Sequence, residues 1–205
     1  MIDNEKEELN QFEYLIQGLI DNQYGVIDDF FLPPIVNGLR ENLAHLNALG
    51  NMKIAGIGNN LGFQINKEIR SDKVHWIEEN TTNFQERVYL EKIWRFIQYL
   101  NRTCFTSIKT FESHYANFEI GSFYKKHIDQ FKTAKGRQFS IILYLNDLWK
   151  DEDGGHIVLY PKDSDVIKIA PLAGRFVFFK SDEMEHEVLP SLTRERSSIA
   201  GWLKN

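Results

Sequence analysis

The sequence contains a single cysteine, Cys104, in 205 residues, which excludes an intrachain disulfide and a cysteine-ligated metal cluster. Basic residues number 24 against 29 acidic ones, so no overall basic surface is expected to attract nucleic acid. No apolar run approaches the ~20 residues of a membrane-spanning helix. The acidic N-terminal segment MIDNEKEELNQ does not look like a signal peptide. These absences predict a cytoplasmic protein without nucleic-acid or membrane partners.

Apolar and aromatic residues are plentiful, at 42% and 13%, so the chain can bury a sizeable core. Apolar residues at helical spacing predict helices over residues 5–20, from Pro33 to about Gly50, and from about Thr81 or Thr82 to Asn101. After Thr103, short runs rich in β-branched and aromatic residues replace this pattern. They predict strands near 105–115, 117–124, 138–145, 155–160, 165–169, 174–180, 185–189 and 196–203.

The order of these elements predicts one α+β domain over residues 1–205. Residues 1–102 form the mainly helical support, and residues 103–205 form a β-roll. Eight short strands separated by turn residues favour an antiparallel double-stranded β-helix (jelly-roll) over a βαβ fold. We expect the N-terminal helices to pack on one of its sheets.

Three residues of the second half have the types and spacing of a metal site. His127 and Asp129 are two apart, so on a strand both side chains point to one face. His186 follows 59 residues later, where another strand could complete the site. Two histidines and one carboxylate leave coordination positions open, as in Fe(II) oxygenases. His-x-Asp alone is a weak signal. The other histidines are interpreted as ordinary polar or core residues: His45, His75, His114 and His156.

A candidate for binding a 2-oxo acid follows the third histidine. Arg196 lies ten residues after His186, on what could be the adjacent antiparallel strand. Its planar guanidinium matches a carboxylate in bidentate fashion, which suits the distant carboxylate of a metal-chelating 2-oxo acid. Arg194 is a rival for this role, and spacing alone does not separate the two.

Several longer segments resemble the prolyl-hydroxylase branch of the 2-oxoglutarate/Fe(II) dioxygenases, most of all the hypoxia-inducible-factor (EGL-nine) type. The resemblance spans roughly residues 24–203. One departure is that the stretch from Tyr115 to His127 looks about two residues longer than usual for the family. The similar segments, in chain order, are IRSDKVHWIEE, YKKHIDQF, RQFSIILYLN, Gly154-Gly155, GRFVFFKSD and HEVLP followed by TR and a terminal Trp202.

The resemblance implies roles for the metal and cofactor residues. His127, Asp129 and His186 would ligate Fe(II), and Arg196 would bind the C5 carboxylate of 2-oxoglutarate. Tyr144 would donate its hydroxyl to the same carboxylate. Tyr115 would be the pocket tyrosine near the iron.

The resemblance also places residues on the substrate side. Arg137 and Trp202 would lie at the mouth where a peptide enters. The upstream segment within residues 1–102 would contribute Asp72, for which we expect an ion pair with Arg137.

The activity implied is hydroxylation of a prolyl residue in a cytosolic protein, giving 4-hydroxyproline, succinate and CO₂. It would use Fe(2+), 2-oxoglutarate and O₂, with L-ascorbate as reductant. Some relatives act on oxygen-sensing transcription factors and others on the translation machinery, and the sequence does not choose between these partners. It leaves open the same chemistry on a free amino acid or small metabolite, and a non-catalytic β-roll binding protein. Nucleic-acid demethylation is disfavoured by the acidic balance.

Overall fold

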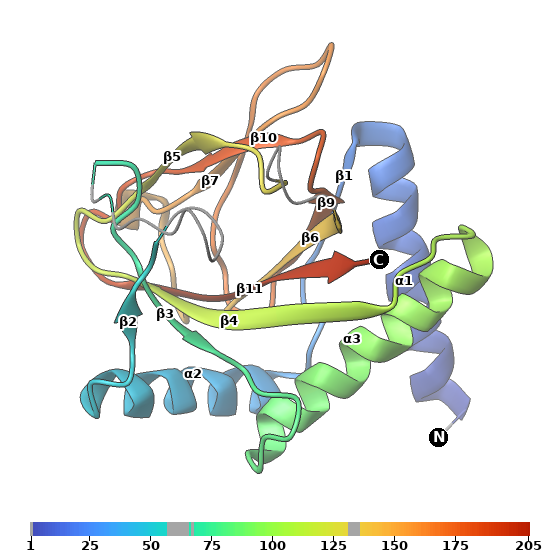
Figure 1. Ribbon diagram of the computed structural model, residues 1–205, viewed down its shortest axis with the longest axis horizontal. Coiled ribbons are helices and arrows are strands. Elements are labelled where there is room, and N and C mark those ends of the chain that lie inside the picture. Colours follow the sequence, from blue (N-terminus) through green and yellow to red (C-terminus); the bar gives the residue numbers. More distant parts are fainter. Residues whose placement is uncertain (1, 57–65, 67, 131–135) are drawn as a thin grey trace.

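The computed structural model describes residues 2–56, 66, 68–130 and 136–205 (Figure 1). A short 3₁₀ helix spans Asp151–Asp153. In chain order the other elements are α1 (Ile2–Asn22), β1 (Tyr24–Ile27), α2 (Pro33–Ala48), β2 (Lys53–Ile54), β3 (Lys73–Trp76), α3 (Phe84–Thr103), β4 (Thr110–Phe118), β5 (Tyr124–His127), β6 (Arg137–Tyr144), β7 (Ile157–Tyr160), β8 (Ile167–Ile169), β9 (Phe176–Lys180), β10 (Glu185–Val188) and β11 (Arg196–Lys204).

The described strands form two antiparallel sheets. The larger has the order β1-β9-β6-β11-β4-β3-β2, and the smaller has the order β5-β10-β7-β8. Helices α1, α2 and α3 lie against one face of the larger sheet, and the smaller sheet lies across its other face (Figure 1). This arrangement confirms the predicted α+β fold, a double-stranded β-helix with N-terminal helices packed on one sheet.

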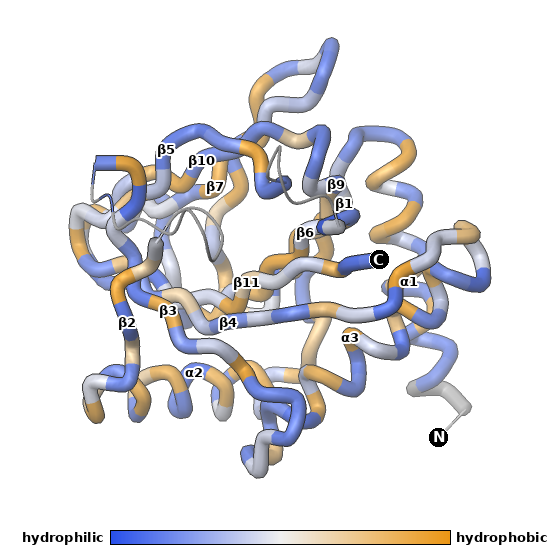
Figure 2. Tube along the Cα trace, in the orientation of Figure 1, coloured by the Kyte–Doolittle hydropathy of each residue, from blue (hydrophilic) through white to orange (hydrophobic). Residues whose placement is uncertain are grey.

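The two-residue period of the strands divides the larger sheet between two environments. On β11, Ile199 and Leu203 pack in the core shared with the helices. The even-numbered residues Arg196, Ser198, Ala200 and Trp202 line a cavity inside the roll. Apolar and polar residues alternate along α2 and α3 (Figure 2), as helices with one buried face require. The sheet therefore carries the fold's main core on one face and a polar cavity on the other.

The three predicted helices are present with shifted ends. Helix α2 begins at Pro33, where the missing N–H of proline has no helical acceptor to lose. Helix α3 begins at Phe84 because Asn83, not Thr81 or Thr82, caps it: the Asn83 side chain accepts from the Glu86 amide at 3.0 Å. No helix in the described ranges is long and apolar enough to cross a membrane.

The strand predictions need two corrections. The strands expected at 105–115 and 117–124 are instead one long strand, β4, followed by the short β5. Strands β1, β2 and β3 were not expected, because two to four residues are too few for a clear two-residue pattern.

Candidate active site

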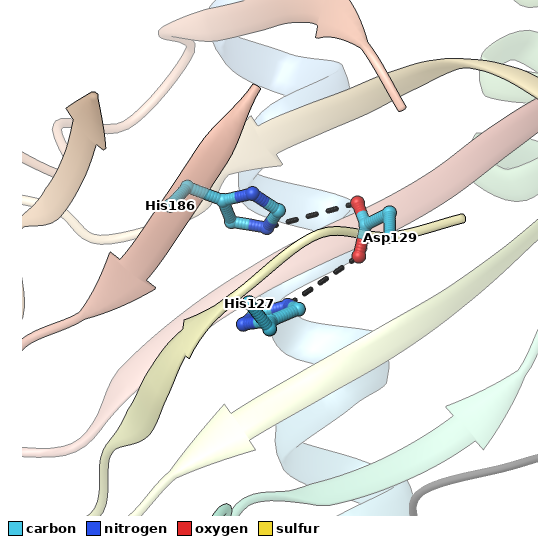
Figure 3. A group of neighbouring side chains, drawn as sticks. All are labelled: His127, Asp129 and His186. Carbon is cyan, nitrogen blue, oxygen red and sulfur yellow. Dashed lines mark ion pairs between the residues drawn. The ribbon is translucent and has the colours of Figure 1, made fainter. Parts of the chain in front are cut away.

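Two adjacent strands of the smaller sheet bring the expected metal ligands together. His127 ends β5 and is the direct cross-strand partner of His186 on β10. Asp129 follows just after β5, and its Oδ1 lies 3.4 Å from His127 Nε2. Its Oδ2 lies 3.7 Å from His186 Nε2 (Figure 3). One ligand atom from each residue lies within 4.8 Å of the other two, so the group could hold one metal ion.

Backbone contacts orient both imidazoles for metal binding. His127 Nδ1 lies 2.7 Å from the Lys125 carbonyl oxygen, and His186 Nδ1 lies 3.1 Å from that of Met184. A carbonyl only accepts, so each Nδ1 carries the proton and donates it. Each Nε2 is then left with a free electron pair on the side of Asp129. This is the tautomer that a metal-bound histidine needs.

The charges of the group also suit a divalent cation. Burial lowers the pKa of His186 to about 4, so this ring is neutral at neutral pH. Burial raises the pKa of Asp129, but the neighbouring histidines and the Ser140 hydroxyl outweigh burial and hold it well below its usual range. Ser140 donates to Asp129 Oδ2 at 2.6 Å and also bonds Ser181. The site thus offers a neutral imidazole from His186 and an ionised carboxylate from Asp129.

The Ser140 hydroxyl gives a first prediction. In Ser140→Ala the carboxylate of Asp129 loses the bond that fixes its rotamer, so Fe(II) affinity is expected to fall by roughly 10- to 100-fold. Anaerobic titration with Fe(II) measures this. Ser181→Ala is the control, since Ser181 reaches Asp129 only through Ser140. Equal affinities in wild type and Ser140→Ala would show that Ser140 does not orient the ligand.

Arg196 is buried deeper in the same cavity. It is 2% exposed, and its Nε donates to the Gly155 carbonyl at 3.0 Å. The guanidinium carbon lies 4.7 Å from the Phe118 ring centre and 4.9 Å from that of Tyr144. No carboxylate among the described residues pairs with it. Arg194, by contrast, is exposed and packs over Trp149, so the structure separates the two arginines that spacing could not.

The paired glycines allow this packing. Gly155 has φ +64°, and a Cβ there would lie 3.2 Å from Arg196 Cδ. Gly154 has φ +71°, and a Cβ there would lie 2.6 Å from the Pro190 carbonyl oxygen. Both backbones occupy the region that favours glycine. The turn before β7 can therefore approach the arginine closely.

Tyr144 lies beside Arg196, on the same face of β6 as the cavity-lining Ser140 and Ile142, and its hydroxyl is buried without a hydrogen-bond partner among the described residues. Burial raises the pKa of this phenol although the nearby Arg196 opposes it, so the hydroxyl stays protonated. A buried donor beside a buried cation without a carboxylate partner is costly in an empty protein. A carboxylate would satisfy both groups.

Tyr115 does not lie where the resemblance placed it. On β4 it faces the helices, where its hydroxyl accepts from Asn42 at 3.2 Å. Phe118, three residues later and on the opposite face of β4, instead turns its ring into the cavity beside Arg196. Odd and even positions of β4 face opposite sides of the sheet, so Tyr115 faces the helices whereas Phe118 faces the cavity.

The expected ion pair between Asp72 and Arg137 is wrong. Both Asp72 oxygens accept from Arg70, at 2.8 and 2.5 Å. Arg137 instead pairs with Glu112 at 3.0 Å, and its guanidinium carbon lies 3.5 Å from the Trp202 ring centre. Arg137 therefore lies against Trp202, which lines the cavity, and Asp72 lines the same cavity with Arg70 as its own partner.

Two further side chains near the metal group were not singled out from the sequence. The Tyr124 ring stacks on His127 with 3.6 Å between ring centres, and the Arg70 guanidinium covers Tyr124 at 4.4 Å. The stack restrains the orientation of the His127 ring. The motifs YKKHID and IRSD contain both residues, but only the three-dimensional pairing shows that they touch.

A jelly-roll with a His/Asp/His group and a buried arginine in one cavity has the arrangement associated with Fe(II) oxygenases. Known proteins agree. Residues 113–204 match the sequence model of the 2OG-Fe(II) oxygenase superfamily. A Caenorhabditis elegans hypoxia-inducible factor prolyl hydroxylase is 32% identical over 147 residues, covering 66% of this chain. The chain spans only about a fifth (20%) of that relative's length.

Solved structures of prolyl hydroxylases are similar to nearly the whole chain. A Pseudomonas putida prolyl-4-hydroxylase is 28% identical with a TM-score of 0.88, covering 95% of this chain and 100% of that one. A Trichoplax adhaerens prolyl hydroxylase, in complex with a hypoxia-inducible factor oxygen degradation domain peptide fragment, is 25% identical, with a TM-score of 0.88. It covers 98% of this chain and 92% of that one. The chain is similar to the 2OG-Fe(II) oxygenase superfamily over residues 113–204, and to solved prolyl hydroxylases over nearly its whole length.

Proposed function

We propose that the chain is an Fe(II)- and 2-oxoglutarate-dependent dioxygenase that hydroxylates a prolyl residue of a cytosolic protein at C4. The observation that carries the proposal is the buried Arg196, which has no carboxylate partner among the described residues and shares a cavity with the His127/Asp129/His186 group. A structural metal site would have closed coordination and no need of a buried cation beside it.

The donor set fits Fe(II). Two imidazole nitrogens and one carboxylate oxygen on one side leave positions open for a chelating co-substrate and for O₂. We assign His127, Asp129 and His186 as the ligands. Their backbone and Ser140 contacts hold them in place before any metal binds.

The inner end of the cavity fits the far carboxylate of 2-oxoglutarate. Arg196 would bind it through charge-assisted hydrogen bonds, and the Tyr144 hydroxyl would donate to the same group. Phe118 and Tyr144 flank the guanidinium and exclude water from it. The dicarboxylate is thereby oriented with its oxo acid end toward the metal ligands.

With iron bound, O₂ converts 2-oxoglutarate to succinate and CO₂, one oxygen atom entering succinate and the other the substrate C–H bond. Ascorbate would keep the iron reduced. The residues of the chain bind, orient and exclude water: Arg196 and Tyr144 fix the co-substrate, while Trp202 and Arg137 border the entrance.

The prolyl substrate rests on the relatives. The C. elegans protein is a hypoxia-inducible factor prolyl hydroxylase, and the P. putida protein is a prolyl-4-hydroxylase. The T. adhaerens protein is a prolyl hydroxylase in complex with a hypoxia-inducible factor peptide fragment. A substrate that is part of a protein would enter past Trp202, whose ring Arg137 covers.

A peptide library tests the proposal without knowledge of the natural target. Peptides with one central proline and randomised flanks are incubated with the protein, Fe(II), 2-oxoglutarate and ascorbate in air. Mass spectrometry should show a gain of one oxygen atom on proline in part of the library, together with succinate. Succinate without hydroxylated peptide would leave the co-substrate chemistry but remove peptidyl proline as the substrate.

A further inference from the structure

His114 is a buried polar side chain that the proposed chemistry leaves without a function. It is 3% exposed, and its Nδ1 has no hydrogen-bond partner in the described part of the chain. Its ring packs against Trp76 and Trp202, with 4.9 and 5.3 Å between ring centres. An unpaired nitrogen in the interior destabilises the ligand-free protein, so it calls for a partner that arrives from outside.

The register of the larger sheet places His114 beside the metal group. His114 lines the same cavity and is the cross-strand partner of Ala200 on β11. Trp202, two residues further along β11, is the partner of Ser140, which donates to Asp129. Arg196 lies at the other end of β11. His114 therefore lines the part of the cavity toward Trp202 and away from Arg196, where we place the substrate.

The ring is neutral under ordinary conditions. Burial, together with the nearby cations Arg70 and Arg137, lowers the pKa of His114 to about 4, against the raising effect of Asp72 and Asp129. A neutral imidazole carries one N–H. If the Nδ1 position carries it, His114 offers one donor and no charge to whatever fills the cavity.

A prolyl residue within a peptide has the complementary chemistry. Its nitrogen has no hydrogen, so the polar groups beside the pyrrolidine ring are carbonyl oxygens, which only accept. We propose that His114 Nδ1–H donates to a carbonyl of the peptide at the target prolyl residue and so positions that residue over the metal. This inference rests on the proposed function, because it takes peptidyl proline as the substrate.

Two substitutions separate a substrate contact from a packing role. His114→Phe keeps an aromatic ring against the two tryptophans but has no nitrogen. His114→Asn keeps a donor at the place of Nδ1, because its amide branches from the same carbon. His75→Phe is the matched control. His75 pairs across β3 and β4 with Tyr115, the residue that follows His114. Its Nδ1 already lies 3.1 Å from the Asn51 carbonyl oxygen, and it is not among the residues that line the cavity.

The first readout is kcat/KM for a peptide that the wild type hydroxylates, selected from the central-proline library. His114→Phe should lower it roughly 5- to 100-fold, because a peptide carbonyl is left buried without a donor. His114→Asn should recover most of this loss, and His75→Phe should match the wild type. Retention of the thermal shift caused by Fe(II) and 2-oxoglutarate under nitrogen shows that the rest of the site is intact.

The second readout is thermal stability without substrate. His114→Phe should raise Tm by roughly 2–8 °C, since it removes an unpaired buried nitrogen, whereas His75→Phe should not. A lower Tm for His114→Phe, or an unchanged kcat/KM, would show that His114 is a structural residue. If the wild type forms succinate but hydroxylates no peptide, His114 has no peptide carbonyl to bind, and this inference is wrong. Absence of succinate would instead refute the proposed function itself.

Discussion

Replacement of Arg196 by methionine is expected to raise the KM for 2-oxoglutarate roughly 100- to 1,000-fold, the cost of leaving a buried charge without its partner. Methionine fills a similar volume without a charge. The buried guanidinium has no carboxylate partner in the described residues, so its removal should not destabilise the ligand-free protein. The measurement is succinate formation as a function of 2-oxoglutarate concentration, together with Tm in its absence.

Arg194→Met is the matched control for this prediction. It removes the same charge two residues away on an exposed side chain, so its KM should equal that of the wild type. If Arg194→Met raised the KM and Arg196→Met did not, the assignment of the co-substrate site to the buried arginine would be wrong. A lower Tm for Arg196→Met than for the wild type would instead indicate that Arg196 stabilises the fold.

Replacement of Asp129 by asparagine is the second change with a large expected effect. It removes the only negative charge among the three proposed ligands while preserving the shape of the side chain. Fe(II) affinity should therefore fall at least roughly 100-fold, a larger loss than the one expected for Ser140→Ala. Anaerobic Fe(II) titration measures the affinity, and succinate formation at fixed Fe(II) should fall with it.

Asp182→Asn controls for the loss of one carboxylate, because Asp182 is exposed on the turn before β10. Its Fe(II) affinity and turnover should match the wild type. An Asp129→Asn variant that still bound Fe(II) with wild-type affinity would contradict the assignment of Asp129 as a ligand.

The sequence was a good guide where the chemistry depends on residue type, although Asp129 lies just after β5 and not on the strand that the spacing assumed. The pairing of His127 with Asp129, and the distant His186, could be inferred because a carboxylate and two imidazoles are the ligands such a metal requires. The helices and the roll could be inferred from their two different periods. The short strands β1, β2 and β3 could not, since they depend on partners far along the chain.

Errors arose where the outcome depends on which face a residue occupies. Tyr115 and Phe118 lie on one strand, and a shift in the assumed alignment was enough to choose the ring that faces the helices. Asp72 pairs with Arg70 rather than Arg137 because the nearer arginine, two residues away, reaches both carboxylate oxygens. The choice between Arg194 and Arg196 depends on which side chain is buried, and spacing along the sequence does not show this.

The most direct test of the central claim is succinate formation from 2-oxoglutarate in air, with Fe(II) and ascorbate, by the wild type and by His127→Ala. His45→Ala is the control, because His45 is exposed on α2, outside the cavity. We predict turnover by the wild type and by His45→Ala that depends on Fe(II), and none by His127→Ala. No turnover by the wild type, together with no Fe(II)-dependent binding of 2-oxoglutarate, would contradict the account and leave a β-roll that binds something else.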